Sequence, residues 1–325
     1  MSDSQLGAFR NLRVLWFPFS IPATLIGAAA SVLSAFGIWV LQPGSGDRAV
    51  VGVACRQLEI LLSGVFAGQL HFDGRSEWLL LGQMTWLILI WGSFGLAMAR
   101  CMVLRLSRDE YISTKEALLF GFQNAGTALL FPVITIGCLL ALSVINGLIG
   151  LLMQLPGLGV VFYLLLPLAW ICAALAMLVG LTALLGSGLV LAAIAAEKQG
   201  TLDAWGKALN YVFARPIQFI IYIILTKIFV VDFIFGLGVA QEIPHRWVNQ
   251  SLTRFFSGES MERIQQGGDN LSGLESFQRT LLTGMDSVMT YGITGLALAS
   301  AAGAFVAMFL ILRQDVDGID PADIS

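Results

Sequence analysis

Charged residues are scarce in this chain of 325 residues: 12% are Asp, Glu, Lys or Arg, while 57% are hydrophobic. A typical soluble domain carries about 25% charged residues. This shortage leaves too little polar surface to cover a globule of this size in water. It excludes an ordinary soluble fold and indicates that lipid is the solvent for much of the chain. The formal net charge of −3 and the absence of a basic stripe exclude a nucleic-acid partner.

Cysteine and histidine are also rare, at four and two residues. Cys101, Cys138 and Cys172 lie in or beside apolar stretches, so no disulfide framework is expected. A metal site needs three or four ligands, and nothing in the sequence brings His71 and His245 together with further ligands. We therefore expect no metal, haem or other cofactor. Because no catalytic constellation can be recognised either, the sequence predicts a protein that is not an enzyme.

Long apolar stretches dominate what is present. A bilayer core of about 30 Å needs about 20 apolar residues in a helix, and only helices fit these stretches, because none alternates like a barrel strand. The sequence predicts an all-α integral membrane protein with six transmembrane helices. These are Ile21–Leu41, Trp78–Met98, Ala128–Leu152, Val160–Thr182, Pro216–Gly238 and Val288–Leu312.

Two stretches leave alternatives open. Residues 50–70 are apolar enough to span, but Arg56 and Glu59 fall near their centre, where each costs about 3 kcal/mol. Residues 184–196 extend an apolar run that is too long for one crossing. Gly186, Ser187 and Gly188 are the candidate helix break, with a short half-helix after them. For both stretches, surface, re-entrant and spanning positions remain open.

Basic residues predict the orientation. With the N-terminus inside, ten Lys and Arg fall in cytoplasmic segments and seven in external ones, mostly in long loops where the positive-inside rule is weak. The ten are Arg10, Arg13, Arg100, Arg105, Arg108, Lys115, Lys198, Lys207, Arg215 and Arg313. We expect both termini in the cytoplasm and a multi-pass location in a bacterial cytoplasmic (inner) membrane.

An amphipathic helix is expected before each pair of spans. The clearest is Leu202–Phe213, where apolar residues recur every three or four positions and Thr201 is the expected N-cap. Ile112–Phe122 and Gln5–Phe17 read similarly. Such helices lie in the headgroup plane as cytoplasmic elbows. One membrane domain, residues 1–313, is thus predicted to contain three elbow-plus-hairpin units, 5–100, 104–198 and 202–313, followed by a frayed acidic tail, 314–325.

Two of these elbows carry a family resemblance. Asp203–Ala204 with Lys207–Pro216 resembles a pattern found in uncharacterised bacterial polytopic membrane-protein families, which are similar to the membrane domain of some glycerophosphodiester phosphodiesterases. Ser107–Glu110 with Ser113–Leu118 resembles the corresponding earlier elbow. The resemblance implies a multi-span helical fold. It implies no activity, because the catalytic barrel of those enzymes is absent from this sequence.

Three charged residues form the candidate intramembrane charge site. Lys227 falls eleven residues after Pro216, so about 17 Å into the bilayer, and Asp232 follows it. Asp286, at the outer end of the last span, could pair with either. One hypothesis is a proton, ion or substrate site of a transporter; the other is a structural ion pair with Lys227 extending toward the interface.

Small residues recur every four positions in the last span, at Gly295, Ala299, Gly303 and Ala307, and predict close helix packing. The leading functional hypothesis is a non-catalytic structural, scaffold or assembly protein that contacts membrane lipids and a protein partner or further copies of itself. The alternatives are a small secondary transporter or channel that uses the intramembrane charges and, behind it, an intramembrane enzyme.

Overall fold

The computed structural model describes residues 20–41, 75–154, 163–226, 228, 231–232, 235–237 and 273–320, and within these ranges the regular elements are all helical. Five of the described helices are long and apolar enough to cross a membrane, and a bent pair makes a sixth if it counts as one span. The chain therefore has the properties of an all-α, multi-pass membrane protein, as the composition predicts.

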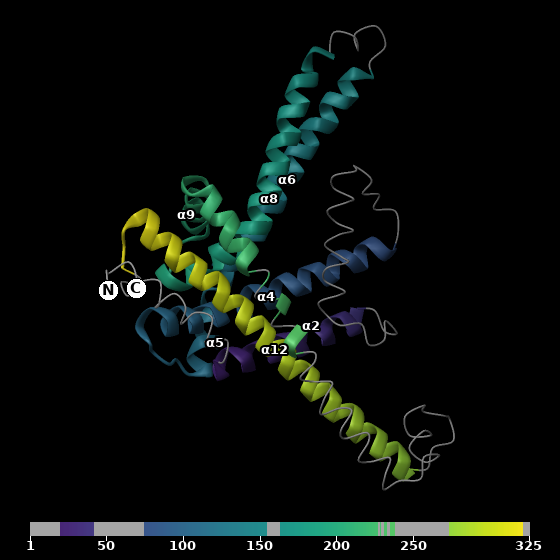
Figure 1. The fold of residues 1–325 in the computed structure, drawn as a ribbon. Helices are drawn as coiled ribbons and strands as arrows, with labels where there is room; N and C mark the ends of the chain where they lie inside the picture. Colours follow the sequence, from purple (N-terminus) through teal and green to yellow (C-terminus); the bar gives the residue numbers. More distant parts are fainter. Residues whose placement is uncertain are drawn as a thin grey trace.

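Three helices form the central bundle. They are α2 (Ile21–Leu41), α4 (Arg75–Arg108) and α12 (Gly273–Asp317), and each contacts the other two. The predicted bounds of α2 agree with the structure, whereas α4 and α12 extend beyond the predicted spans at both ends. Figure 1 shows α12 crossing the bundle, with its first turns projecting beyond it.

Two further helices form a separate hairpin. These are α6 (Ala125–Met153) and α8 (Leu166–Glu197), the latter preceded by a short 3-10 turn, η2 (Tyr163–Leu165). They lie side by side and project away from the bundle (Figure 1). Only 6% of the apolar stretch 163–183 and 17% of that in α6 are buried, against 67% in α4. We call residues 133–153 and 163–185 the arm.

Two short helices connect these parts. Helix α5 (Thr114–Gln123) begins at a capping box, in which the Ser113 side chain accepts from the Glu116 N–H and the Glu116 carboxylate accepts from the Ser113 N–H. Helix α9 (Thr201–Ala214) ends before Pro216, and the helix 216–226 that follows is turned by 104°. Both occupy stretches that the sequence predicts as amphipathic helices.

The packed centre lies where the long helices meet α5 and α9. Residues 96–99 of α4, 189–190 and 192–196 of α8, and 306–310 of α12 are buried there, together with Ala117 and Tyr211 of the short helices. We call this region the hub. Beyond it the helices separate, and the arm extends from the hub on its own (Figure 1).

The predicted helix break in α8 is wrong. The helix runs without interruption from Leu166 to Glu197, through Gly186, Ser187 and Gly188. The physical reason for a glycine here is packing: a Cβ on Gly188 would collide with the ring of Phe305 on α12. Glycine costs a helix about 1 kcal/mol, which the surrounding turns tolerate.

Two smaller predictions are also wrong. The N-cap of α9 is Gly200, and Thr201 is its first helical residue. Its hydroxyl has another partner, the carbonyl of Thr127 on α6, which accepts its hydrogen bond at 2.6 Å. The tail predicted at 314–325 is not frayed at its start, because α12 continues to Asp317. Contacts with α8 and α9, described below, hold this last turn.

Several predictions concern residues outside the described ranges. These are the first elbow, Gln5–Phe17, the stretch 50–70, the tail beyond residue 320, and His71 and His245.

Candidate functional site

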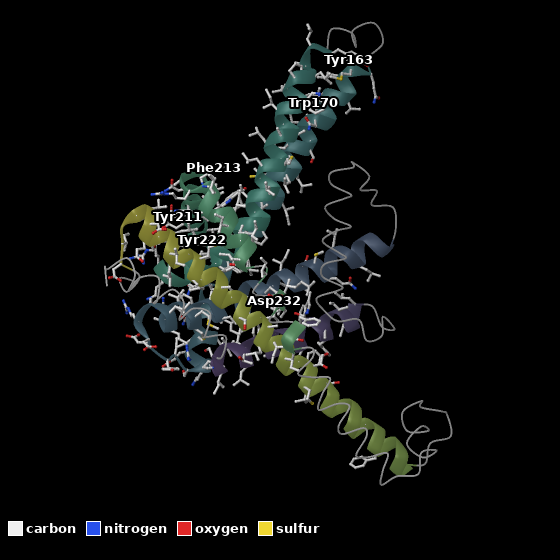
Figure 2. All side chains as sticks on the ribbon, viewed as in Figure 1. Tyr163, Trp170, Tyr211, Phe213, Tyr222 and Asp232 are labelled. Carbon is white, nitrogen blue, oxygen red and sulfur yellow. The ribbon has the colours of Figure 1, made fainter. Side chains whose placement is uncertain are left out.

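The predicted intramembrane charge site is described only in part. Lys227 lies outside the described residues. Asp286 belongs to α12, but its side chain is not among those that the structure describes. Asp232 is exposed and lies beside the bundle, as Figure 2 shows. These three residues therefore stay a prediction, and the charges that the structure does bring together lie elsewhere.

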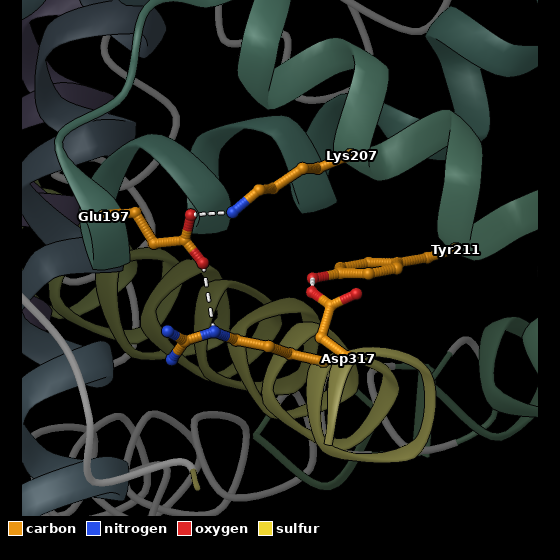
Figure 3. Close-up of polar contacts among 5 residues, drawn as sticks. Glu197, Lys207, Tyr211 and Asp317 are labelled. Atoms are coloured by element: carbon orange, nitrogen blue, oxygen red, sulfur yellow. Dashed lines mark hydrogen bonds and ion pairs between the residues drawn. The ribbon is translucent and has the colours of Figure 1, made fainter. Parts of the chain in front are cut away.

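A buried ion-pair centre joins three helices in the hub. Glu197, the last residue of α8, forms ion pairs with Lys207 of α9 and with Arg313 of α12, where Arg313 Nε lies 3.0 Å from Glu197 Oε1 (Figure 3). The side chains of Glu197 and Arg313 are only 8% and 6% exposed, whereas that of Lys207 is 32% exposed. One carboxylate thus holds two cations that come from different helices.

A second contact fixes the end of α12 beside this centre. The Tyr211 hydroxyl of α9 donates a hydrogen bond of 2.5 Å to Asp317 Oδ2 (Figure 3). The Tyr211 side chain is fully buried and its ring lies 5.8 Å from that of Phe309. Burial and the bond to Asp317 raise the pKa of Tyr211 well above its ordinary value. The phenol therefore stays protonated and keeps donating over the whole physiological pH range.

Arg100 connects two further helices to the end of α8. Arg100 of α4 donates to the carbonyl of Ala195 at 2.6 Å, in the last turn of α8, and its guanidinium lies 5.0 Å from the centre of the Phe120 ring. Carbonyls in a last turn lack helical partners, and a cation there also complements the helix dipole. Arg100 thus ties α4 and α5 to the end of α8.

Two aromatic pairs also join helices of the hub. Trp205 of α9 meets Phe131 of α6 edge to face, with centroids 5.6 Å apart, and Phe94 of α4 meets Phe122 of α5 in the same way at 5.5 Å. Such pairs contribute about 0.5–1.5 kcal/mol beyond their buried area. Helix α2 is also joined to α4, because Trp86 Nε1 donates a hydrogen bond of 3.0 Å to the Leu33 carbonyl.

The contacts of this cluster connect helices to one another. Glu197 and Asp317 balance Lys207 and Arg313, so the four formal charges sum to zero. The network holds α8, α9 and α12 in register; the side chains of Glu197 and Arg313 are buried, whereas Lys207 and Asp317 reach solvent. Within the described part of the chain, no group of three or more His, Cys, Asp or Glu could hold a metal ion.

Sequence analysis did not identify this cluster. It used Lys207 and Arg313 only as markers of orientation and placed Asp317 in a frayed tail. A usable signal was Glu197 itself, an acid that directly ends a 32-residue apolar helix. Such an acid at the edge of a hydrophobic run needs a cation nearby.

The small-residue ladder of α12 faces helices of the same chain. Gly295 packs backbone to backbone against α2: a Cβ there would lie 2.5 Å from the carbonyl oxygen of Thr24, and one on Gly27 would lie 2.7 Å from that of Gly295. Gly303 faces the Met102 sulfur of α4. Ala299 and Ala307 are buried in the same interface region.

Comparison with known proteins adds no identification: no protein-family model, no curated protein and no solved structure matches this chain.

Proposed function

We propose that the chain is a non-catalytic integral membrane protein with a structural, scaffold or assembly role in a bacterial cytoplasmic membrane. Three elbow-plus-hairpin units, with both termini in the cytoplasm, make up this protein. The partners are membrane lipids and the transmembrane helices of another protein or of a second copy. The 104° turn at Pro216 supports the elbow interpretation of α9, and the capped helix α5 supports that of the preceding unit.

The arm is the observation that carries the proposal. Its large apolar side chains point outward on both helices, including Val144 (59% exposed) on α6 and Met177 (61% exposed) on α8. Figure 2 shows Tyr163 and Trp170 near its far end, well away from the bundle. A two-helix element that packs so little against its own chain leaves its surface open to lipid or to the helices of a partner.

The charged residues support the same class of function. The described cations and anions of the hub, Glu197 with Lys207 and Arg313, are used to join helices to one another. A scaffold needs such fixed internal connections, because its surfaces must keep a constant geometry for a partner.

Site-specific photocrosslinking in the native membrane tests the proposal. A crosslinking amino acid is placed at Val144 or Met177 in the arm and, as a matched control, at the equally exposed Leu202 of α9 (63%). Crosslinked particles are then purified in mild detergent and weighed by native mass spectrometry. We expect one stoichiometric protein adduct from both arm positions and none from Leu202.

Other outcomes reject the proposal in different ways. Adducts with lipid alone from all positions mean that the arm is an ordinary lipid-facing span. A particle that retains a small solute, with flux in proteoliposomes that Asp232→Asn abolishes, replaces the scaffold role by transport.

A further inference from the structure

Burial along α8 decreases from the hub toward the arm. Leu189 and Val190 are fully buried, as are Ala192 and Ala193, whereas only 6% of the apolar stretch 163–183 is buried. The change falls at Gly186–Gly188. Gly188 lies against Phe305, while Gly186 is buried but a Cβ on it would meet no atom within 4 Å.

Burial along helix α6 also decreases, a short distance after the helix begins. Ala128 and Phe131 are buried in the hub, and Thr135 is the last buried residue before a stretch, reaching to Leu148, that contains none. Pro132 lies inside this helix at the point of change. It has no N–H to donate to the Ala128 carbonyl, and its ring crowds that carbonyl, so the helix is weakened there.

The two weakened positions lie at comparable distances from the hub ends of their helices. Helix α6 starts at Ala125 and α8 ends at Glu197, and the two helices run side by side in opposite directions. Pro132 is therefore about 10 Å above the start of α6, and Gly188 is about 14 Å above the end of α8, at 1.5 Å per residue. Below this level Thr201 is bonded to the Thr127 carbonyl, and Arg100 to that of Ala195.

We propose that Pro132 and Gly186–Gly188 form a paired hinge, about which the arm turns as one unit relative to the hub and the central bundle. A hinge needs a weakened backbone in both helices of the hairpin, at comparable distances from a fixed base, with few contacts to the rest of the chain beyond it. The α6–α8 hairpin has all of these. The inference stands on the geometry of the hairpin and does not depend on what the arm contacts.

Distances between spin labels test the hinge in the full-length protein in lipid nanodiscs. Labels are attached to cysteines in a background whose four native cysteines are replaced by alanine. One pair spans the hinge, at Leu89 of α4 and Val144 of the arm. A second pair, Val144 and Met177, lies within the arm; all three positions are exposed. We expect a broad distance distribution for the first pair and a narrow one for the second.

Stiffening substitutions make the test specific. Pro132→Ala restores the helical N–H, and Gly186→Ala adds a methyl group into open space. Together they should narrow the Leu89–Val144 distribution roughly twofold. Gly147→Ala, at an open position of α6 beyond the hinge, is the matched control and should leave it unchanged.

Two results overturn the hinge. One is a Leu89–Val144 distribution in the unsubstituted protein that is as narrow as that of Val144–Met177. The other is a broad distribution that Gly147→Ala narrows as much as the hinge substitutions do. The first result needs no variant of the hinge itself, so a failure of the double variant to fold leaves the test intact.

Discussion

Glu197 is the residue on which the hub depends most. It faces two cations, and its side chain is 8% exposed, close to the 6% of Arg313. Taking charges out of water costs several kcal/mol, which their mutual attraction must offset. Loss of a single partner is therefore far more costly than loss of the whole pair, because the remaining charge stays buried.

Glu197→Gln should lower the free energy of unfolding by about 3–5 kcal/mol, since it leaves Arg313 buried without its carboxylate. Adding Arg313→Met should recover part of this loss, because the second charge is then removed as well. Thermal unfolding of purified protein, followed by tryptophan fluorescence, measures the difference. Lys115→Met, at an exposed position on α5, is the control and should shift the midpoint little. A double variant that is less stable than the single one would contradict the buried-pair account.

The backbone contact between α2 and α12 gives a second prediction at this scale. Gly295→Ala should destabilise the protein by about 1–3 kcal/mol, because the added Cβ would overlap the backbone of α2 and push the two helices apart. Gly292→Ala, one turn away on α12, adds the same methyl group into open space. It should be neutral or stabilising by up to about 1 kcal/mol, since alanine is the better helix former.

The measurement is again the unfolding midpoint, taken for both variants in the same detergent. Equal shifts for Gly295→Ala and Gly292→Ala would show that the close approach of α2 does not determine stability.

The residues at which α2 and α5 begin are determined by nearby sequence. The bounds of α2 follow from a hydrophobic run with Pro22 in its first turn, and those of α5 from Ser113 and Glu116 at cap spacing. These signals lie within a few residues of the boundary they set, so a single sequence reveals them. The bend at Pro216 has the same local origin.

Packing shows what local sequence leaves open. Glycines at 186 and 188 are compatible with a break or with a continuous helix, and the choice depends on Phe305, more than a hundred positions away. The ion pairs of Glu197 likewise depend on where α9 and α12 arrive. Such information lies in the tertiary arrangement, which hydrophobic periodicity does not encode.

The cap of α5 provides a prediction at the element scale. Ser113→Ala removes the acceptor for the Glu116 N–H and should cost the first turn about 1 kcal/mol. Hydrogen exchange of the amides at 115–117 should then become faster. Thr114→Ala, the adjacent residue inside the helix, is the matched control and should leave exchange unchanged. Equal rates in both variants would mean that tertiary contacts, and not the cap, hold this turn.

The whole molecule divides into a connected hub and helices that separate beyond it. Arg100, Glu197 and Arg313 join helices within the hub, and all three lie near helix ends that the positive-inside rule assigns to the cytoplasmic face. If this face is cytoplasmic, the far end of the arm must lie on the other side of the membrane. Helix α6, with 29 residues, is about 43 Å long and exceeds the bilayer core of about 30 Å.

Accessibility to a membrane-impermeant maleimide in spheroplasts measures this directly. In a background lacking Cys55, we expect Gln154→Cys, an exposed position at the end of α6, to react in intact spheroplasts. Lys198→Cys, an exposed position beside the hub, should react only after the membrane is permeabilised. The reverse pattern would invert the topology and place the ion-pair hub outside. Reaction of both cysteines without permeabilisation would mean that the arm does not cross at all, and its apolar surface would then have to be covered by another protein.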